Sequence, residues 1–192
     1  MATKQKIAST FPNMVIVLTA VALISALALS FTNLMTLEAR QLVEVKRTIR
    51  ALKDVLPEFD NDPNSEKFKV DGFDELEFFP AKKEDRPVGT AIKTFSDDAF
   101  SERIWLMVGF DSENKIYRIS VLKQRETPGL GTKMKEAKFK KQFDHKDPVS
   151  FKIKVKKDGG DVDAITAATI SSRAFCDAVN RAYRALLRGG ER

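Results

Sequence analysis

The sequence predicts an α+β fold: an antiparallel sheet packed with helices, preceded by one N-terminal transmembrane helix. Three observations lead to this prediction. Residues 14–31 carry no charge, the middle of the chain holds strand-like runs separated by turns, and the C-terminal part shows an amphipathic helical pattern. We divide the chain into a tail (1–13), a transmembrane helix (14–31), a juxtamembrane helix or linker (32–60) and one folded domain (61–192).

The first of these elements is the uncharged run Met14–Phe31, which is rich in Val, Leu, Ile and Ala. As an α-helix it would be ~27 Å long, close to the ~30 Å hydrocarbon core of a bilayer. A cleaved signal peptide is the alternative, because Lys4 and Lys6 precede the run and Ala26-Leu27-Ala28 resembles a cleavage site. The length of the run favours a retained anchor. Basic residues flank both of its ends, so charge alone does not set its orientation.

A second helical pattern spans residues 37–56 and stops before Pro57. Its apolar residues are spaced by three and four: Leu42, Val45, Ile49, Leu52 and Leu56. This segment either continues the membrane helix outward and packs on the domain, or forms a seam that faces a neighbouring protein.

Strand-like runs follow a turn-rich loop at residues 60–65. They cover residues 76–79, 88–95, 103–110 and 115–123, and the last two flank the hairpin-like loop Asp111–Asn114. Strands that neighbour one another in sequence and are joined by hairpins form an antiparallel sheet. Residues 132–143 predict a short basic helix, and residues 149–156 alternate apolar and polar like a further strand.

The last part of the chain, up to Leu187, predicts a long amphipathic helix. Its apolar residues recur at spacings of three, four or seven: Ala168, Phe175, Val179, Ala182 and Leu186. Asp163 or Thr166 is the predicted N-cap, and Thr169 then lies in or just before the first turns. Because the small residues Ala167 and Ala168 precede it and a helix N-terminus attracts anions, this place suits a phosphate group.

The rarity of cysteine and histidine restricts the chemistry available to this chain. With Cys176 and His145 the only residues of their kinds, thiolate iron–sulfur ligation, a c-type haem site and a zinc site within the chain are excluded. Gly129-Leu130-Gly131 lacks the third glycine and the context of a dinucleotide fingerprint. Any redox cofactor must therefore be organic. We interpret Cys176 as a small buried residue, His145 as a surface residue and Trp105 as part of the core.

The net charge of +6 is mild, and residues 133–156 supply much of it. No interleaving of aromatic and basic residues supports nucleic-acid binding. We interpret the basic run as a solvated face; the alternative is that it compensates a phosphate or an acidic partner.

Two short motifs carry a resemblance to a known family. Residues 163–171, Asp-Ala-Ile-Thr-Ala-Ala-Thr-Ile-Ser, resemble the flavinylation motif Asp-x-x-Ser/Thr-Gly/Ala-Ala-Thr-Ser/Thr of membrane FMN-binding proteins. Residues 126–131, Glu-Thr-Pro-Gly-Leu-Gly, match the second signature of that family at every position. In size and layout the chain is most similar to the members that form the G subunit of the Rnf electron-transport complex. The C subunit of the sodium-translocating NADH:quinone oxidoreductase is a larger relative.

The resemblance implies that residues 61–192 form an FMN-binding domain, with FMN attached to Thr169 through a phosphoester. It implies a cofactor pocket lined by further residues of the two motifs: Thr166, Ala167, Ala168, Glu126, Thr127, Gly129 and Leu130. Glycine is usual in the family where this chain has Ala167, and the added methyl group would narrow the approach of the modifying enzyme. Asp163 is the acidic residue of the motif.

The resemblance also implies a function. The chain would be a membrane-anchored, electron-relaying subunit of an ion-translocating ferredoxin:NAD⁺ oxidoreductase, with no catalytic side chain and no metal site of its own. Its partners would be the other membrane subunits and, for maturation, a flavin transferase that uses FAD and a divalent metal. The tail would lie in the cytoplasm, and the domain on the periplasmic side of the inner membrane.

Three alternatives stay open. The chain could be the C subunit of a sodium-translocating NADH:quinone oxidoreductase. It could bind FMN without a covalent bond, or serve as a membrane-anchored binding or scaffold domain without a cofactor.

Overall fold

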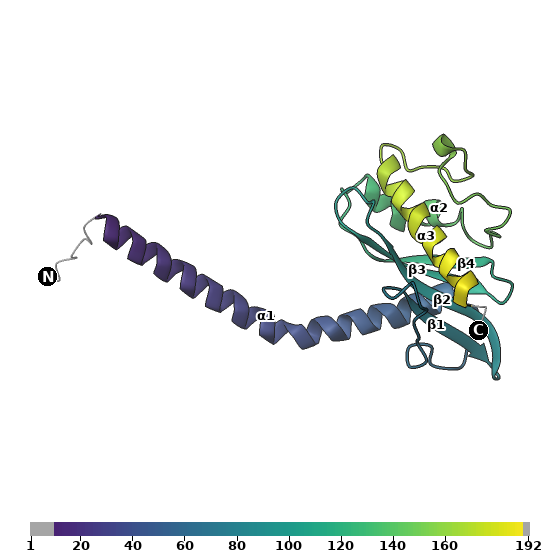
Figure 1. Ribbon diagram of the computed structural model, residues 1–192, viewed down its shortest axis with the longest axis horizontal. Coiled ribbons are helices and arrows are strands. Elements are labelled where there is room, and N and C mark those ends of the chain that lie inside the picture. The colour runs from purple at the N-terminus through teal and green to yellow at the C-terminus, as the bar shows by residue number, and fades with distance from the viewer. Residues whose placement is uncertain (1–9, 190–192) are drawn as a thin grey trace. The chain divides into compact units, whose positions relative to one another are not determined.

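The computed structural model describes residues 10–189 (Figure 1). It divides into two compact units that meet between Lys46 and Arg47. Most of the predicted N-terminal tail, with Lys4 and Lys6, lies outside the described residues. The elements in order are α1 (Phe11–Val55), β1 (Glu77–Lys83), β2 (Arg86–Ser96), β3 (Ile104–Asp111), β4 (Ile116–Lys123), η1 (Gly131–Lys135), α2 (Ala137–Lys140), η2 (Lys156–Asp158) and α3 (Thr169–Gly189).

A single helix, α1, covers both helical patterns predicted in the N-terminal part of the sequence. Its first half contains the uncharged run, and by length and composition α1 can cross a membrane. The Thr32 and Thr36 hydroxyls donate to carbonyl oxygens one turn earlier, so these polar side chains are satisfied within the helix. The last turns bury Ala51, Leu52 and Val55. Of the five apolar residues of the 37–56 pattern, Leu52 and Leu56 are buried in the domain, while Leu42, Val45 and Ile49 are exposed. A seam that faces a neighbouring protein therefore stays a prediction for the exposed part of the pattern.

The four predicted strands form one antiparallel sheet in the order β1-β2-β3-β4, as the sequence predicts. The Asp111–Asn114 hairpin loop is also confirmed. One Asp111 carboxylate oxygen accepts the N–H groups of Glu113 and Lys115, at 2.9 and 3.0 Å. Asn114 adopts a left-handed conformation with φ +62°, which asparagine tolerates better than most residues.

Helices cover both faces of the sheet because successive strand residues point to opposite sides. Leu106, Val108 and Phe110 of β3 belong to the core beneath α3, which crosses the sheet in Figure 1. Met107 belongs to a second core, formed with the end of α1. Buried apolar area of this kind stabilises a fold by roughly 25 cal/mol per Å². The predicted α+β class with helices packed on an antiparallel sheet is confirmed.

The strand predicted at residues 149–156 is wrong. Ile153 and Val155 are buried and produce the alternating pattern, but the segment is irregular apart from an isolated bridge between Val155 and Val162. Its backbone groups pair within the loop: the Lys152 N–H donates to the Asp161 carboxylate at 2.7 Å, and the Lys156 N–H to the Val162 carbonyl at 2.8 Å. These local hydrogen bonds replace those of a sheet.

The basic helix predicted at residues 132–143 is correct only in part. The structure has the 3₁₀ segment η1 and the single turn α2 instead of one helix. Glu136 separates them, because its extended backbone (φ −69°, ψ 142°) breaks the helical hydrogen-bond pattern.

The contact between α1 and β3 yields a prediction. A Cβ atom on Gly109 would overlap the backbone carbonyl of Val55. Gly109→Ala should therefore lower the free energy of unfolding by about 3 kcal/mol, the upper end for overpacking, because a backbone atom cannot turn aside. Urea denaturation measures this loss. Gly159→Ala is the control: Gly159 has φ +78° and open space around it, so only backbone strain of about 1 kcal/mol is expected. Equal losses in the two variants would contradict the packing at Gly109.

Candidate functional site

The two motifs lie against each other, joined by the buried side chain of Glu126. This side chain is only 4% exposed. One carboxylate oxygen accepts the Ser171 hydroxyl at 2.5 Å, and the other accepts the Ser101 N–H at 3.1 Å. The first of these hydrogen bonds connects the loop that follows β4 to the first turn of α3.

The two glycines of the 126–131 motif have different roles. Gly129 has φ +76° and nothing near its Cβ position; it lies in a tight turn closed by the Leu130 N–H and the Thr127 carbonyl at 3.2 Å. Gly131 is buried, and a Cβ atom there would lie 2.5 Å from both the Glu126 carboxylate and the Ser171 hydroxyl. The side chains of Glu126 and Ser171 therefore approach the backbone closely at Gly131, where the absence of a Cβ atom leaves room for their hydrogen bond.

The helix α3 begins at Thr169, within the predicted first turns. The predicted capping is wrong: Asp163 and Thr166 lie six and three residues before that start, too far along the chain for an N-cap. The Ser172 hydroxyl instead binds the segment before the helix: it donates to the Ala168 carbonyl and accepts the Ile165 N–H, both at 2.9 Å. This arrangement fixes the chain on its way into the helix.

The first backbone amides of α3 are available to a ligand. No acceptor for the N–H groups of Thr169, Ile170 and Ser171 is found among residues 10–189. The Thr169 side chain is half-buried at the same place. Free amides and the positive end of a 21-residue helix dipole form a favourable environment for a phosphate.

A cavity of about 370 Å³ opens at this point. Six of the eight predicted cofactor residues line it, namely Glu126, Thr127, Leu130, Ala167, Ala168 and Thr169. The sequence did not single out its other lining residues, which are Phe100, Gly131, Ile170 and Ser171. Gly131, Ile170 and Ser171 belong to the two motifs, so the motifs themselves could have indicated them. Phe100 stands in a polar stretch, and no sequence signal indicates it.

The two remaining predicted residues lie elsewhere. Gly129 is in the exposed turn described above, and Thr166 lines a neighbouring cavity of about 460 Å³ together with Lys133 and Lys138. Asp163 lines the same cavity; its carboxylate pairs with Lys156 at 2.7 Å. The Gln142 amide accepts the Asp163 N–H at 2.7 Å and donates to the Asp163 carbonyl at 3.2 Å, which holds the backbone of the motif's acidic residue.

The interpretations of the three single residues are mostly confirmed. Cys176 is 3% exposed, and burial raises the pKa of its thiol to about 12, so it is unreactive at neutral pH. His145 is exposed and meets the edge of Tyr117. Trp105 is half-buried at the margin of the second core, beside Phe95. Within residues 10–189, no group of three or more His, Cys, Asp or Glu side chains could hold a metal ion.

Comparison with known proteins shows which family the chain belongs to. Residues 100–184 match the FMN-binding domain model. The G subunit of the ion-translocating oxidoreductase complex of Shewanella amazonensis is 32% identical over 179 residues, which cover 86% of this chain and 83% of that protein. The chain belongs to this G-subunit family.

Other relatives in the family are matched over varying lengths. The G subunit of Stutzerimonas stutzeri is 33% identical over 82% of this chain and 72% of its own length. The G subunit of Erwinia tasmaniensis is 39% identical, and the match spans 53% of this chain and half of that relative. Among solved structures, the C subunit of the Na⁺-translocating NADH-quinone reductase from Parabacteroides distasonis has a TM-score of 0.46 and 23% identity, covering 71% of this chain and 77% of that one.

Ala167 yields a second prediction. It has φ +61°, a left-handed conformation that is strained for alanine and free for glycine. Ala167→Gly should therefore raise the free energy of unfolding by about 0.5–1 kcal/mol, the strain relieved minus the extra entropy that glycine loses on folding. Chemical denaturation measures the change. The control is Ala174→Gly inside α3, which should lower stability by at least about 1 kcal/mol, because glycine disfavours the helix and a buried methyl group is removed. A loss of stability in both variants would contradict the strain at Ala167.

Cys176 yields a prediction about pH. Its pKa is raised from 9.0 to about 12 by burial, so the protonated thiol stabilises the fold fully below pH 9, and this contribution is lost as pH rises toward 12. Between pH 8 and pH 10, the free energy of unfolding should fall about 1.4 kcal/mol further in the wild type than in Cys176→Ala. Denaturant titrations at the two pH values test this. An equal fall in the free energy of unfolding of the wild type and Cys176→Ala would show that the thiol is not desolvated.

Proposed function

We propose that this chain is the membrane-anchored flavoprotein subunit of an ion-translocating ferredoxin:NAD⁺ oxidoreductase (Rnf) complex, relaying electrons through FMN attached by a phosphoester to Thr169. The observation that carries the proposal is the placement of Thr169. It is the first residue of α3 and lines a cavity together with residues from both motifs. The match to the FMN-binding domain and the names of the G-subunit relatives support the cofactor and the complex.

The residues present fit FMN. The Thr169 hydroxyl oxygen would carry the phosphoryl group, beside the free amides of the first turn of α3. Ala168 and Gly131 have small or no side chains, which leaves room in the cavity, while Thr127 and Leu130 would provide polar and apolar walls. Pockets for ligands of this size combine apolar walls with a few fixed polar groups.

When bound, FMN would supply one- and two-electron redox chemistry. The chain's own residues would hold the ring, exclude water from it and set its environment. Thr169 would be a tether and take no part in turnover. A covalent link would also keep the cofactor from being lost on the periplasmic side of the membrane, where we place the domain.

The finer assignments are part of the same proposal. α1 would be a retained single-pass anchor in the inner membrane, with the tail in the cytoplasm. The other membrane subunits of the complex would be the partners in electron transfer. A flavin transferase would attach FMN, and the exposed Thr166 and Asp163 would lie on the surface that this enzyme approaches.

Replacing Thr169 by alanine tests the tether. Thr169→Ala should fold normally but carry no covalent flavin, because the oxygen that would bear the phosphoryl group is missing. Beyond the mass change of the substitution itself, intact mass should fall short of the wild type by FMN minus water, and in-gel flavin fluorescence under denaturing conditions should be lost. Thr166→Ala is the matched control, since this threonine lies in the same motif and lines the other cavity. It should keep its flavin.

The same measurements separate the alternatives. Fluorescence that survives in Thr169→Ala and disappears in Thr166→Ala would move the tether to Thr166. Colour that is lost when the wild type is denatured would indicate FMN bound without a covalent link. A wild type free of flavin after expression with the transferase would indicate a scaffold domain.

A further inference from the structure

The loop of residues 97–103, between β2 and β3, carries an exposed aromatic ring to the edge of the Thr169 cavity. Phe100 is 65% exposed, yet it lines this cavity together with Leu130 and Ile170, which are also exposed. An aromatic side chain this exposed gains little stabilisation from burial in the protein itself. An apolar ligand in the cavity would cover the ring and bury it.

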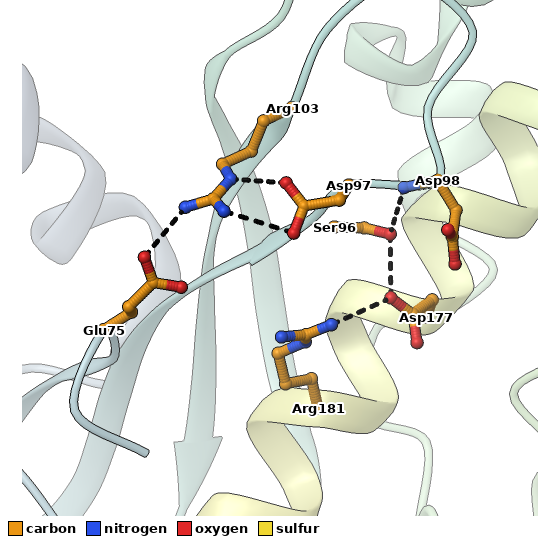
Figure 2. Close-up of polar contacts among 7 residues, drawn as sticks. All are labelled: Glu75, Ser96, Asp97, Asp98, Arg103, Asp177 and Arg181. Carbon is orange, nitrogen blue, oxygen red and sulfur yellow. Dashed lines mark hydrogen bonds and ion pairs between the residues drawn. The ribbon is translucent and has the colours of Figure 1, made fainter.

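The two ends of this loop are fixed by polar contacts (Figure 2). At one end, the Ser96 hydroxyl donates to Asp177 of α3 at 2.7 Å and accepts the Asp98 N–H at 3.3 Å. At the other end, Arg103 donates to Asp97 at 2.6 Å and to Glu75 at 3.2 Å. These contacts place the loop beside α3, but they do not reach its tip.

The tip of the loop is held by Glu126. Ser101 follows Phe100 in sequence, and its N–H donates to the Glu126 carboxylate. Glu102 also pairs with Arg125 at 2.8 Å, but the two side chains are 48% and 68% exposed, and solvent weakens such a pair. The hydrogen bond to the buried carboxylate is therefore the stronger restraint on Phe100.

We propose that Glu126 is a positioning residue, whose carboxylate holds Ser101 and Ser171 together so that Phe100 forms the outer wall of the cavity and shields a bound flavin from water. Each carboxylate oxygen already bonds a protein donor, and the side chain is covered. Glu126 thus acts on the flavin through Phe100. This inference rests on the proposed function, because it concerns the same cavity.

Hydrogen exchange tests the Glu126 bond without any flavin. In the flavin-free Thr169→Ala background, Glu126→Ala should raise the exchange rate of the Ser101 amide about tenfold, since a protecting hydrogen bond is lost. Glu126→Gln should keep most of the protection, because its amide oxygen can accept the Ser101 N–H while its NH₂ donates to the Ser171 hydroxyl. If Glu126→Ala does not fold, Ser171→Ala replaces it and should raise the same rate. An unchanged Ser101 rate in the folded variant would overturn the proposal.

Iodide quenching of flavin fluorescence tests the shielding. In flavin-loaded protein, verified by intact mass, Phe100→Ala should raise the quenching constant about twofold, because one wall of a largely enclosed ligand is removed. Glu126→Ala should have the same effect and Glu126→Gln should not. Phe68→Ala, which removes another exposed ring, is the control and should leave quenching unchanged. Equal quenching in the wild type and Phe100→Ala would overturn the role of Phe100. A wild type without flavin would overturn the proposed function instead, and the exchange experiment would still test the Glu126 bond.

Discussion

The hydrogen bond between Glu126 and Ser171 is the contact on which the rest of the site depends. It joins residues 45 positions apart, one in the loop after β4 and one in the first turn of α3. A buried carboxylate is costly unless its oxygens are bonded, and here Ser171 and Ser101 satisfy both of them. The absence of a side chain at Gly131 leaves the space in which this bond forms. Both motifs are thus parts of one structural unit.

The sheet holds this unit in place, because α3 packs on β2 and β3. Thr94 of β2 donates its hydroxyl to the Ala178 carbonyl of α3 at 2.9 Å, and this buried bond joins the middle of the helix to the sheet. On the opposite face, the end of α1 packs against the sheet, so the segment that begins as an apolar helix ends as part of the domain core. Ala51, Leu52 and Val55, in the last turns of α1, are therefore part of the domain's second core. A loss of packing there would reach the sheet that carries the site.

The sequence predicted the strands and α3 because their patterns are local: alternation in the strands and one apolar stripe in the helix. It failed at residues 149–156, where Ile153 and Val155 alternate like a strand although the backbone pairs within its own loop. For the site, the motifs predicted six residues that the structure brings together at one cavity. The role of Glu126 and the place of Phe100 depend on long-range contacts with Ser101 and Ser171, which no local pattern contains.

The start of α3 combines two opposing demands, access and enclosure. If Thr169 carries FMN as we propose, its hydroxyl must be accessible to the modifying enzyme, and its side chain is only half-buried. A flavin bound there would benefit from a fixed and partly dry environment, and Glu126 and Gly131 are buried residues of the cavity lining. Ala167, with φ +61°, lies two residues before the start of α3, in the turn that leads into the helix. Strain of about 1–2 kcal/mol at this one residue is then the cost of presenting the threonine at a helix start.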